Sequence, residues 1–142
     1  MTAECQVDFY LLRNAALEVR QFACRLAAMA WERGHRVAML VESEQAAEEL
    51  DRLLWDFPPG RFIPHEAGPD GAAAPVWIAS AASLKEGDVV INLSPQPVAE
   101  PSRFRRLLEI VPQVEAQRRA SREKFRYYRD RGFRAEMHEI SE

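Results

Sequence analysis

The architecture of this chain is set by residues 7–55, which read VDFYLLRNAALEVRQFACRLAAMAWERGHRVAMLVESEQAAEELDRLLW. Two short apolar runs, residues 7–12 and 36–41, are typical of buried strands. Between them, a broad apolar stripe predicts a helix over residues 17–33, and Gly34 supplies its stop. The segment therefore begins with a strand, a helix and a second strand.

A second helix is predicted to start at an N-cap at Ser43, to continue through Trp55 and to end at the Pro-Pro-Gly of residues 58–60. Strand–helix alternation with short joints indicates βαβ units and a largely parallel sheet covered by helices. A chain of 142 residues is most simply one domain, here residues 1–142.

The remaining elements are shorter until the carboxyl-terminal third. In chain order we expect a strand at 61–64, a surface loop at 66–74, strands at 76–79 and 89–93, a short helix at 102–108, a strand at 109–111, a long helix at 113–130 stopped by Gly132, and a final strand at 133–138.

Composition excludes several classes of protein. A hydrophobic content of 47% is ordinary for a folded domain, and the longest apolar run is too short to cross a bilayer. The amino terminus does not read as a signal peptide. Cys5 and Cys24 are too few and wrongly spaced for a disulfide framework or a zinc site. We expect reduced thiols and a cytoplasmic protein.

Motifs for catalysis or nucleotide binding are missing from the sequence. The six glycines do not form a phosphate-binding loop, and the first strand leaves into Arg13-Asn14-Ala15-Ala16, whose side chains would block a phosphate. The histidines lie on separate segments without ligand spacing, and the serines lack a nucleophile elbow. His65 beside Glu66 is the most suggestive, but no nucleophile is indicated. We expect no catalytic residue, no metal and no cofactor. The residues weighed were His35, His65, His138, Ser80, Ser83 and Ser94.

Charge is the most informative feature of the carboxyl-terminal third. Between Pro101 and Arg134 lie 11 of the 19 basic residues and only 4 acidic ones, a balance of +7 against −10 elsewhere. On the long helix, residues three and four apart share a face. Phe125 borders the cationic ridge formed there, and Tyr128 is the better candidate for core packing. The ridge consists of Arg118, Arg122, Arg126 and Arg129.

Three classes of ligand compete for this molecule. Nucleic acid would be held by phosphate contacts, whereas an acidic peptide with an apolar end would use the arginines and an adjoining pocket. The acidic remainder of the domain repels a long polyanion, which favours the peptide. A small-molecule enzyme would instead need a polar pocket near Arg13, Asn14 and Glu42.

Short motifs in a fixed order resemble the chi subunit family of bacterial DNA polymerase III holoenzyme, accessories of the clamp loader. They are Phe9-Tyr10-Leu11-Leu12; Trp31, Gly34, Arg36 and Val37; Leu50-Asp51 with Leu54-Trp55; Phe62-Ile63-Pro64-His65; Ala74-Pro75-Val76; Asp88-Val89-Val90-Ile91; Val111-Pro112; Arg122-Glu123; Tyr128-Arg129; and Gly132-Phe133.

The resemblance implies a Rossmann-like α/β domain, mostly parallel, with helices on both faces and no phosphate-binding loop. It implies a non-catalytic subunit that takes part in DNA replication by binding the acidic C-terminal tail of single-stranded DNA-binding protein, so that contact with single-stranded DNA is indirect. A direct nucleic-acid-binding module using the same helix is the alternative. The resemblance also implies pairing with the psi subunit, if one is present, near Trp55 and Phe62.

By position in the family, the tail site would combine an apolar pocket at Val111, an aromatic wall at Phe125 and cationic contacts at Arg122 and Arg126. Arg118 and Arg129 extend the cationic ridge. Phe125 stands where the family pattern has tyrosine, and Arg126 where it has lysine, which keeps the charge but changes its geometry.

Overall fold

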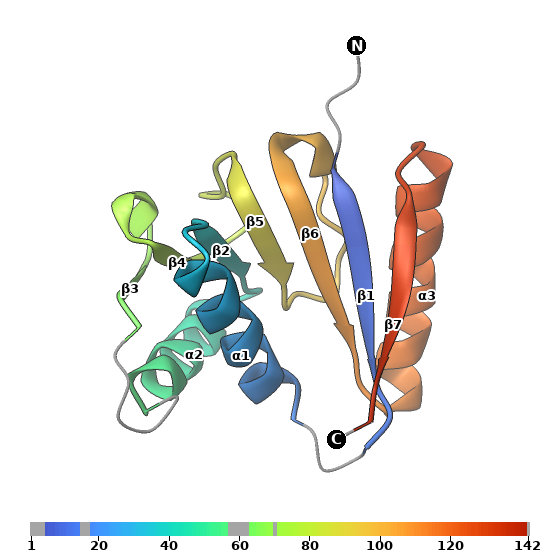
Figure 1. Cartoon of the computed structure of the whole chain (residues 1–142), viewed down its shortest axis with the longest axis horizontal. Helices are drawn as coiled ribbons and strands as arrows, with labels where there is room; N and C mark the ends of the chain where they lie inside the picture. The colour runs from blue at the N-terminus through green and yellow to red at the C-terminus, as the bar shows by residue number, and fades with distance from the viewer. Residues whose placement is uncertain (1–4, 15–17, 57–62, 70, 142) are drawn as a thin grey trace.

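A single parallel sheet forms the body of the protein, seen in a computed structural model that describes residues 5–14, 18–56, 63–69 and 71–141 (Figure 1). Within these ranges the sheet has seven strands in the order β3-β4-β2-β5-β6-β1-β7. Every strand pair is parallel, which confirms the predicted α/β class. The strands are β1 (Gln6–Leu12), β2 (Val37–Leu40), β3 (His65–Ala67), β4 (Val76–Ala79), β5 (Gly87–Asn92), β6 (Phe104–Val111) and β7 (Ala135–Ile140).

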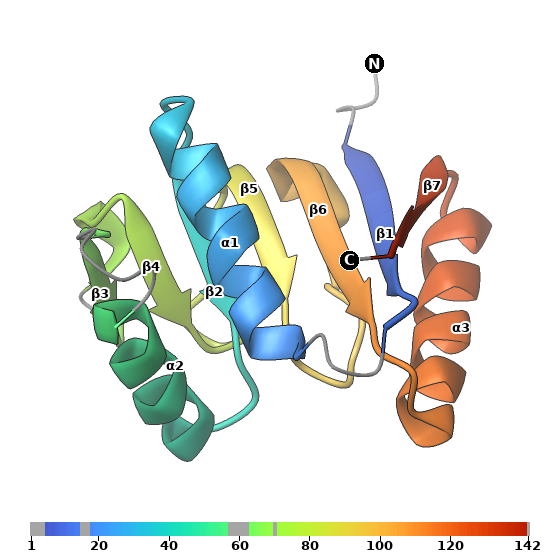
Figure 2. The same cartoon turned by 60° about the horizontal axis from the view of Figure 1, so that its bottom comes forward.

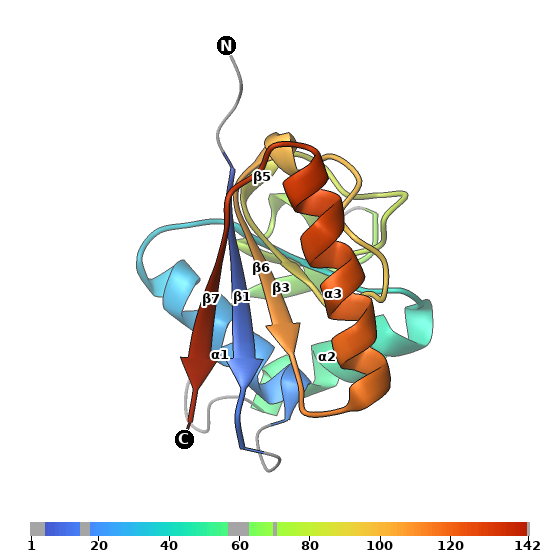
Figure 3. The same cartoon turned by 90° about the vertical axis from the view of Figure 1, so that its right-hand side faces the viewer.

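Helices cover both faces of the sheet, as predicted. Two of them, α1 (Val19–Glu32) and α2 (Glu44–Asp56), pack on one face over β2, β4 and β5 (Figure 2). The third, α3 (Glu115–Asp130), packs on the other face over β6 and β7 (Figure 3). Each face has its own apolar core, one around Met39 and Ile91 and the other around Phe9 and Leu107. None of the helices in the described ranges combines the length and apolarity that crossing a membrane requires.

The amino-terminal elements follow the predictions closely. The Ser43 hydroxyl accepts a hydrogen bond from the backbone N–H of Ala46 at 3.1 Å, so it does cap α2. Gly34 adopts φ +89°, the left-handed conformation expected of a helix stop. Leu17 and the Pro-Pro-Gly of residues 58–60 lie outside the described residues.

The third strand was misplaced. The sequence predicted residues 61–64, of which Arg61 and Phe62 lie outside the described residues, whereas β3 begins at His65. The predicted loop over 66–74 therefore contains the end of β3 and a 3₁₀ turn at Gly71–Ala73. Because β3 is an edge strand paired only with β4, it tolerates polar residues that obscure an apolar pattern.

The short helix predicted over residues 102–108 is wrong. A 3₁₀ turn at Pro101–Arg103 leads directly into β6, which pairs with both β5 and β1. A short apolar run such as Leu107–Val111 fits a buried helix and a buried strand equally well by periodicity. Burial on both faces between two other strands decides for the strand.

Candidate functional site

The helix α3 presents an unusual pattern of burial. Its buried residues are Ser121, Lys124 and Tyr128, all polar, while most of its arginines face outward. The helix begins with Glu115 in its first turn and ends before Gly132, whose φ of +87° reverses the chain toward β7. Tyr128 is fully buried, which confirms its assignment to the core.

A groove of about 620 Å³ runs between α3 and the strands β1, β6 and β7. All six residues predicted for tail binding line it, so the structure brings the whole predicted set together. The lining comprises Phe9, Leu11, Arg13, Val111, Arg118, Ser121, Arg122, Phe125, Arg126, Arg129, Asp130 and Met137.

Apolar side chains form the floor of the groove. Phe9 and Leu11 lie on the same side of β1, and Val111 lies at the end of β6. Phe125 leans from α3 onto Phe9 with an edge-on ring contact at 5.5 Å between centroids, so it forms a wall. The side chain of Met137 is 52% exposed at the open side. Such a floor can bury an apolar ligand group.

The α3 arginines of the groove make few ion pairs with the domain's own carboxylates, so they can bind an anionic ligand. Arg122 reaches Glu115 at 3.1 Å, but both side chains are well exposed, so this pair is weak. Arg118 donates to the backbone oxygen of Pro112, and the guanidinium of Arg129 lies 5.8 Å from the ring centre of Phe125. Among the described residues, no carboxylate forms an ion pair with Arg126 or Arg129.

Sequence reasoning missed Phe9, Leu11 and Met137 as groove residues. Phe9 and Met137 are register partners of β1 and β7, strands from opposite ends of the chain. The alternation of Phe9 and Leu11 marks one face of β1, but only the pairing of β7 with β1 shows that this face adjoins α3.

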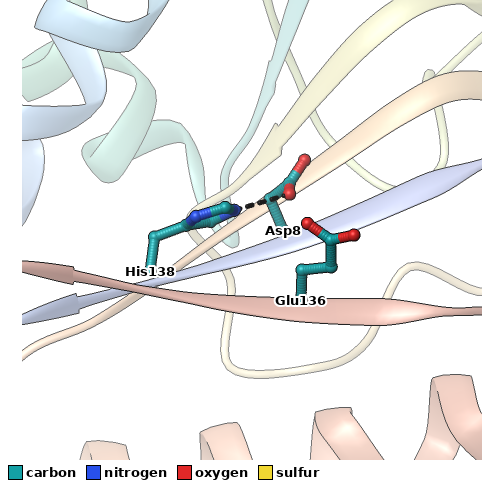
Figure 4. A group of neighbouring side chains, drawn as sticks. All are labelled: Asp8, Glu136 and His138. Carbon is teal, nitrogen blue, oxygen red and sulfur yellow. Dashed lines mark hydrogen bonds and ion pairs between the residues drawn. The ribbon is translucent and has the colours of Figure 1, made fainter.

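A polar cluster of Asp8, Glu136 and His138 lies on the opposite face of β1 and β7 (Figure 4). The sequence showed no ligand spacing around the histidines, yet Nε2 of His138 lies 2.8 Å from Oδ1 of Asp8, a residue distant in the chain. Burial alone raises the pKa of Asp8, but hydrogen bonds from His138, Arg106 and Gln6 outweigh it and hold that pKa below its usual range. Because Arg106 sits 2.7 Å from the second carboxylate oxygen, a cation already balances this buried charge, and the cluster joins β7 to β1.

Of the two residues predicted for psi binding, Trp55 is among the described residues. Trp55 is at the end of α2, which packs on β3 and β4, so it is near the sheet edge opposite the groove. Its side chain is 58% exposed and borders a hollow of about 480 Å³ together with acidic residues of α2. The buried His65 packs against its ring and lies 3.1 Å from Oδ1 of Asp51, although the angles fall short of a hydrogen bond. Phe62 lies outside the described residues.

The residues named for an enzyme pocket do not converge. Arg13 lines the groove and pairs with Glu139 at 2.6 Å. Glu42 instead borders a hollow of about 600 Å³ on the other side of α3, near the carboxyl ends of β2 and β5. Asn14 lines neither of these two spaces.

Comparison with known proteins identifies the family. The family model described as DNA polymerase III chi subunit, HolC, matches residues 5–136. The chain belongs to the DNA polymerase III chi subunit family. It is 36% identical over 137 residues to the DNA polymerase III subunit chi of Pseudomonas aeruginosa, covering 95% of this chain and 96% of that relative. It is 33% identical over 134 residues to the Escherichia coli subunit chi, covering 88% and 91%.

The comparison with solved structures gives information on the fold alone. The Saccharomyces cerevisiae protein Dbp5 bound to RNA and ADP BeF3 matches with a TM-score of 0.62 at 14% identity, over 99% of this chain. The match spans only 42% of the Dbp5 chain, and its L327V variant matches with a TM-score of 0.63. The likeness agrees with a Rossmann-like arrangement of parallel strands and helices.

Proposed function

We propose that this chi-family protein is a non-catalytic accessory subunit that links the polymerase clamp loader to single-stranded DNA-binding protein. It does so by holding that protein's acidic C-terminal tail in the groove between α3 and the sheet. The observation that carries the proposal is the meeting of the arginines of α3 with an apolar floor in one hollow. The order of the chi-family motifs supports single-stranded DNA-binding protein as the partner.

Two unequal terms hold the tail. Exposed arginine–carboxylate pairs contribute roughly 0.2–1 kcal/mol each and weaken with salt. Burial of an apolar terminal side chain against Phe9, Val111 and Phe125 contributes about 1.5–3 kcal/mol and depends little on salt. The arginines therefore mainly speed association, and the floor slows release.

Charge distribution supports a short acidic ligand over a long one. The cationic ridge occupies one helix, whereas the residues outside 101–134 carry a net charge of −10. A compact peptide can lie along the ridge without approaching the acidic α2, but an extended polyanion would be repelled beyond the ridge.

Pull-down with single-stranded DNA-binding protein, intact and lacking its last residues, tests the function. We expect capture of the intact protein and loss of capture after the truncation. Equal capture of both forms would refute the tail as the ligand. Tight binding of a short single strand at physiological salt, without any tail peptide, would favour the nucleic-acid alternative.

For the second partner, we infer that the psi subunit contacts the surface around Trp55. An exposed tryptophan beside the acidic residues Glu48 and Asp51 suits a partner segment with apolar and basic side chains. Because Trp55 and the groove lie near opposite edges of the sheet, both partners can bind together. Trp55→Ala should abolish psi co-purification and leave tail binding unchanged; loss of both would contradict two separate surfaces.

A further inference from the structure

A buried carboxylate joins the sheet to α3. Glu109 lies toward the carboxyl end of β6, and its side chain is 1% exposed. Its Oε1 accepts from Nζ of Lys124 at 2.9 Å, and its Oε2 accepts from the hydroxyl of Tyr128 at 2.6 Å. Asn92 of β5 donates to the same Oε2 at 2.8 Å. One carboxylate therefore binds two successive turns of α3 and the neighbouring strand.

The same network reaches the segment that follows β5. Nζ of Lys124 also donates to the backbone oxygen of Ser94 at 2.7 Å, and the Tyr128 hydroxyl accepts from the backbone N–H of Val98 at 2.9 Å. The Asn92 amide donates to the backbone oxygen of Gln96 at 2.8 Å. The polar groups of the network are thus paired in the low-dielectric interior, where such pairs are strong and directional.

The apolar packing of α3 comes mainly from three aromatic side chains, Phe125, Tyr127 and Tyr128. Its sequence, EAQRRASREKFRYYRD, contains no leucine, isoleucine, valine or methionine. A slip of one residue would rotate the helix by about 100° and shift it by about 1.5 Å. Such a slip would turn Phe125 away from Phe9. Nondirectional contacts tolerate such a movement far better than the two short hydrogen bonds from Lys124 and Tyr128 to one carboxylate do.

We propose that Glu109, Lys124 and Tyr128 are positioning residues for the groove, because together they set the rotation and axial position of α3. Lys124 and Tyr128 are four residues apart and lie on one stripe of the helix. Holding this stripe against β6 directs Phe125 and the arginines beside it toward the floor. The role in ligand binding rests on the function proposed above, whereas the role in orienting α3 stands without it.

Two double variants test the proposal with identical changes in charge. Glu109→Gln with Lys124→Gln keeps a chain of hydrogen-bonding groups, whereas Glu109→Met with Lys124→Met keeps only volume. Apolar replacement of a buried ion pair often preserves stability, so the methionine pair should still fold. We expect the glutamine pair to bind an acidic tail peptide within about threefold of wild type, and the methionine pair about tenfold more weakly. Equal affinity of the two double variants would overturn the proposal.

Hydrogen exchange gives a readout that needs no peptide. The methionine pair should lose at least about tenfold protection in the amides of α3 relative to the glutamine pair, with β5 and β6 unchanged. If the wild-type protein binds no acidic peptide, the proposed function fails, and this exchange measurement decides the positioning role alone. Tyr128→Phe removes one anchor and should show a smaller loss in α3. Unchanged protection of α3 in all variants would refute the proposal.

Discussion

Salt dependence separates the two terms that we assign to the groove. The perturbations are Arg126→Glu, which reverses one exposed charge of the groove, and Phe125→Ala, which removes its aromatic wall. Arg119→Glu serves as the control, since Arg119 is exposed on the same helix but does not line the groove. All three variants should fold, because none of these side chains is fully buried.

The size of each effect follows from the surroundings of the side chain. Arg126 is exposed, so its attraction to a ligand carboxylate is about 0.2–1 kcal/mol, and reversing its charge costs about twice that. Such a loss is a factor of about 2–30 at low salt, shrinking to under about twofold near 1 M, where the screening length is about 3 Å. Phe125 is half-buried against Phe9, and losing its wall costs about 1–2 kcal/mol at any salt concentration.

Fluorescence anisotropy with a labelled acidic tail peptide measures the affinity of the wild type and the three variants between about 0.02 and 1 M salt, a range over which the Debye length falls severalfold. Arg126→Glu should converge on the wild type as salt rises, whereas the curve of Phe125→Ala should stay parallel to it. Arg119→Glu should weaken binding less than Arg126→Glu throughout. If Phe125→Ala converges with salt as Arg126→Glu does, the apolar floor does not hold the ligand, and the division into two terms is wrong.

Three further outcomes follow from buried groups. Tyr128→Phe removes a hydrogen bond to the buried Glu109 carboxylate and leaves a backbone N–H unpaired, so urea unfolding should show a loss of about 2–4 kcal/mol; an unchanged midpoint would contradict the network. The pKa of Asp8 is held below its usual 3.8, so the stabilisation by its carboxylate is present above that pH and is lost as pH falls through the folded value. The melting temperature of Asp8→Asn should therefore be lower than that of the wild type at neutral pH and should fall less as the solution is acidified. Parallel declines of the two melting temperatures in acid would refute this. Burial raises the pKa of Cys5 to about 11 and that of Cys24 to about 12, so a thiol reagent at pH 8 should label both slowly until denaturant is added.

The first half of the fold was predictable because local patterns and tertiary structure agree there. The apolar runs of β1 and β2 and the cap at Ser43 need no knowledge of distant residues. By contrast, the start of β6 was predicted as a short helix, and only its place between β5 and β1 makes it a strand. Glu109 fell in the strand predicted at 109–111, but only the central place of β6 in the sheet shows that its carboxylate requires a buried partner.

On the sheet, only Val111 was predicted for the site, from the family resemblance, whereas the residues on the helix followed from their spacing. Spacing along α3 places the arginines and Phe125 on one side, and the structure confirms that they line one groove. The floor depends on β7 pairing with β1, for which the sequence carries no local signal. Lys124 shows the limit of counting charges, because it belongs to the basic segment but is neutralised by Glu109 inside the protein.

The length of α3 sets the length of the ligand. With 16 residues, α3 is about 24 Å long, which an extended peptide spans with about seven residues. Outside residues 101–134 the chain carries a net charge of −10, so the rest of the domain offers no net attraction to further carboxylates. A synthetic peptide of the last eight or so residues of the tail should therefore compete as strongly as one twice as long, whereas its amidated form should compete less, because the terminal carboxylate is lost. Competition against the labelled peptide measures this, and an affinity that keeps rising with length would show that the ligand extends past α3.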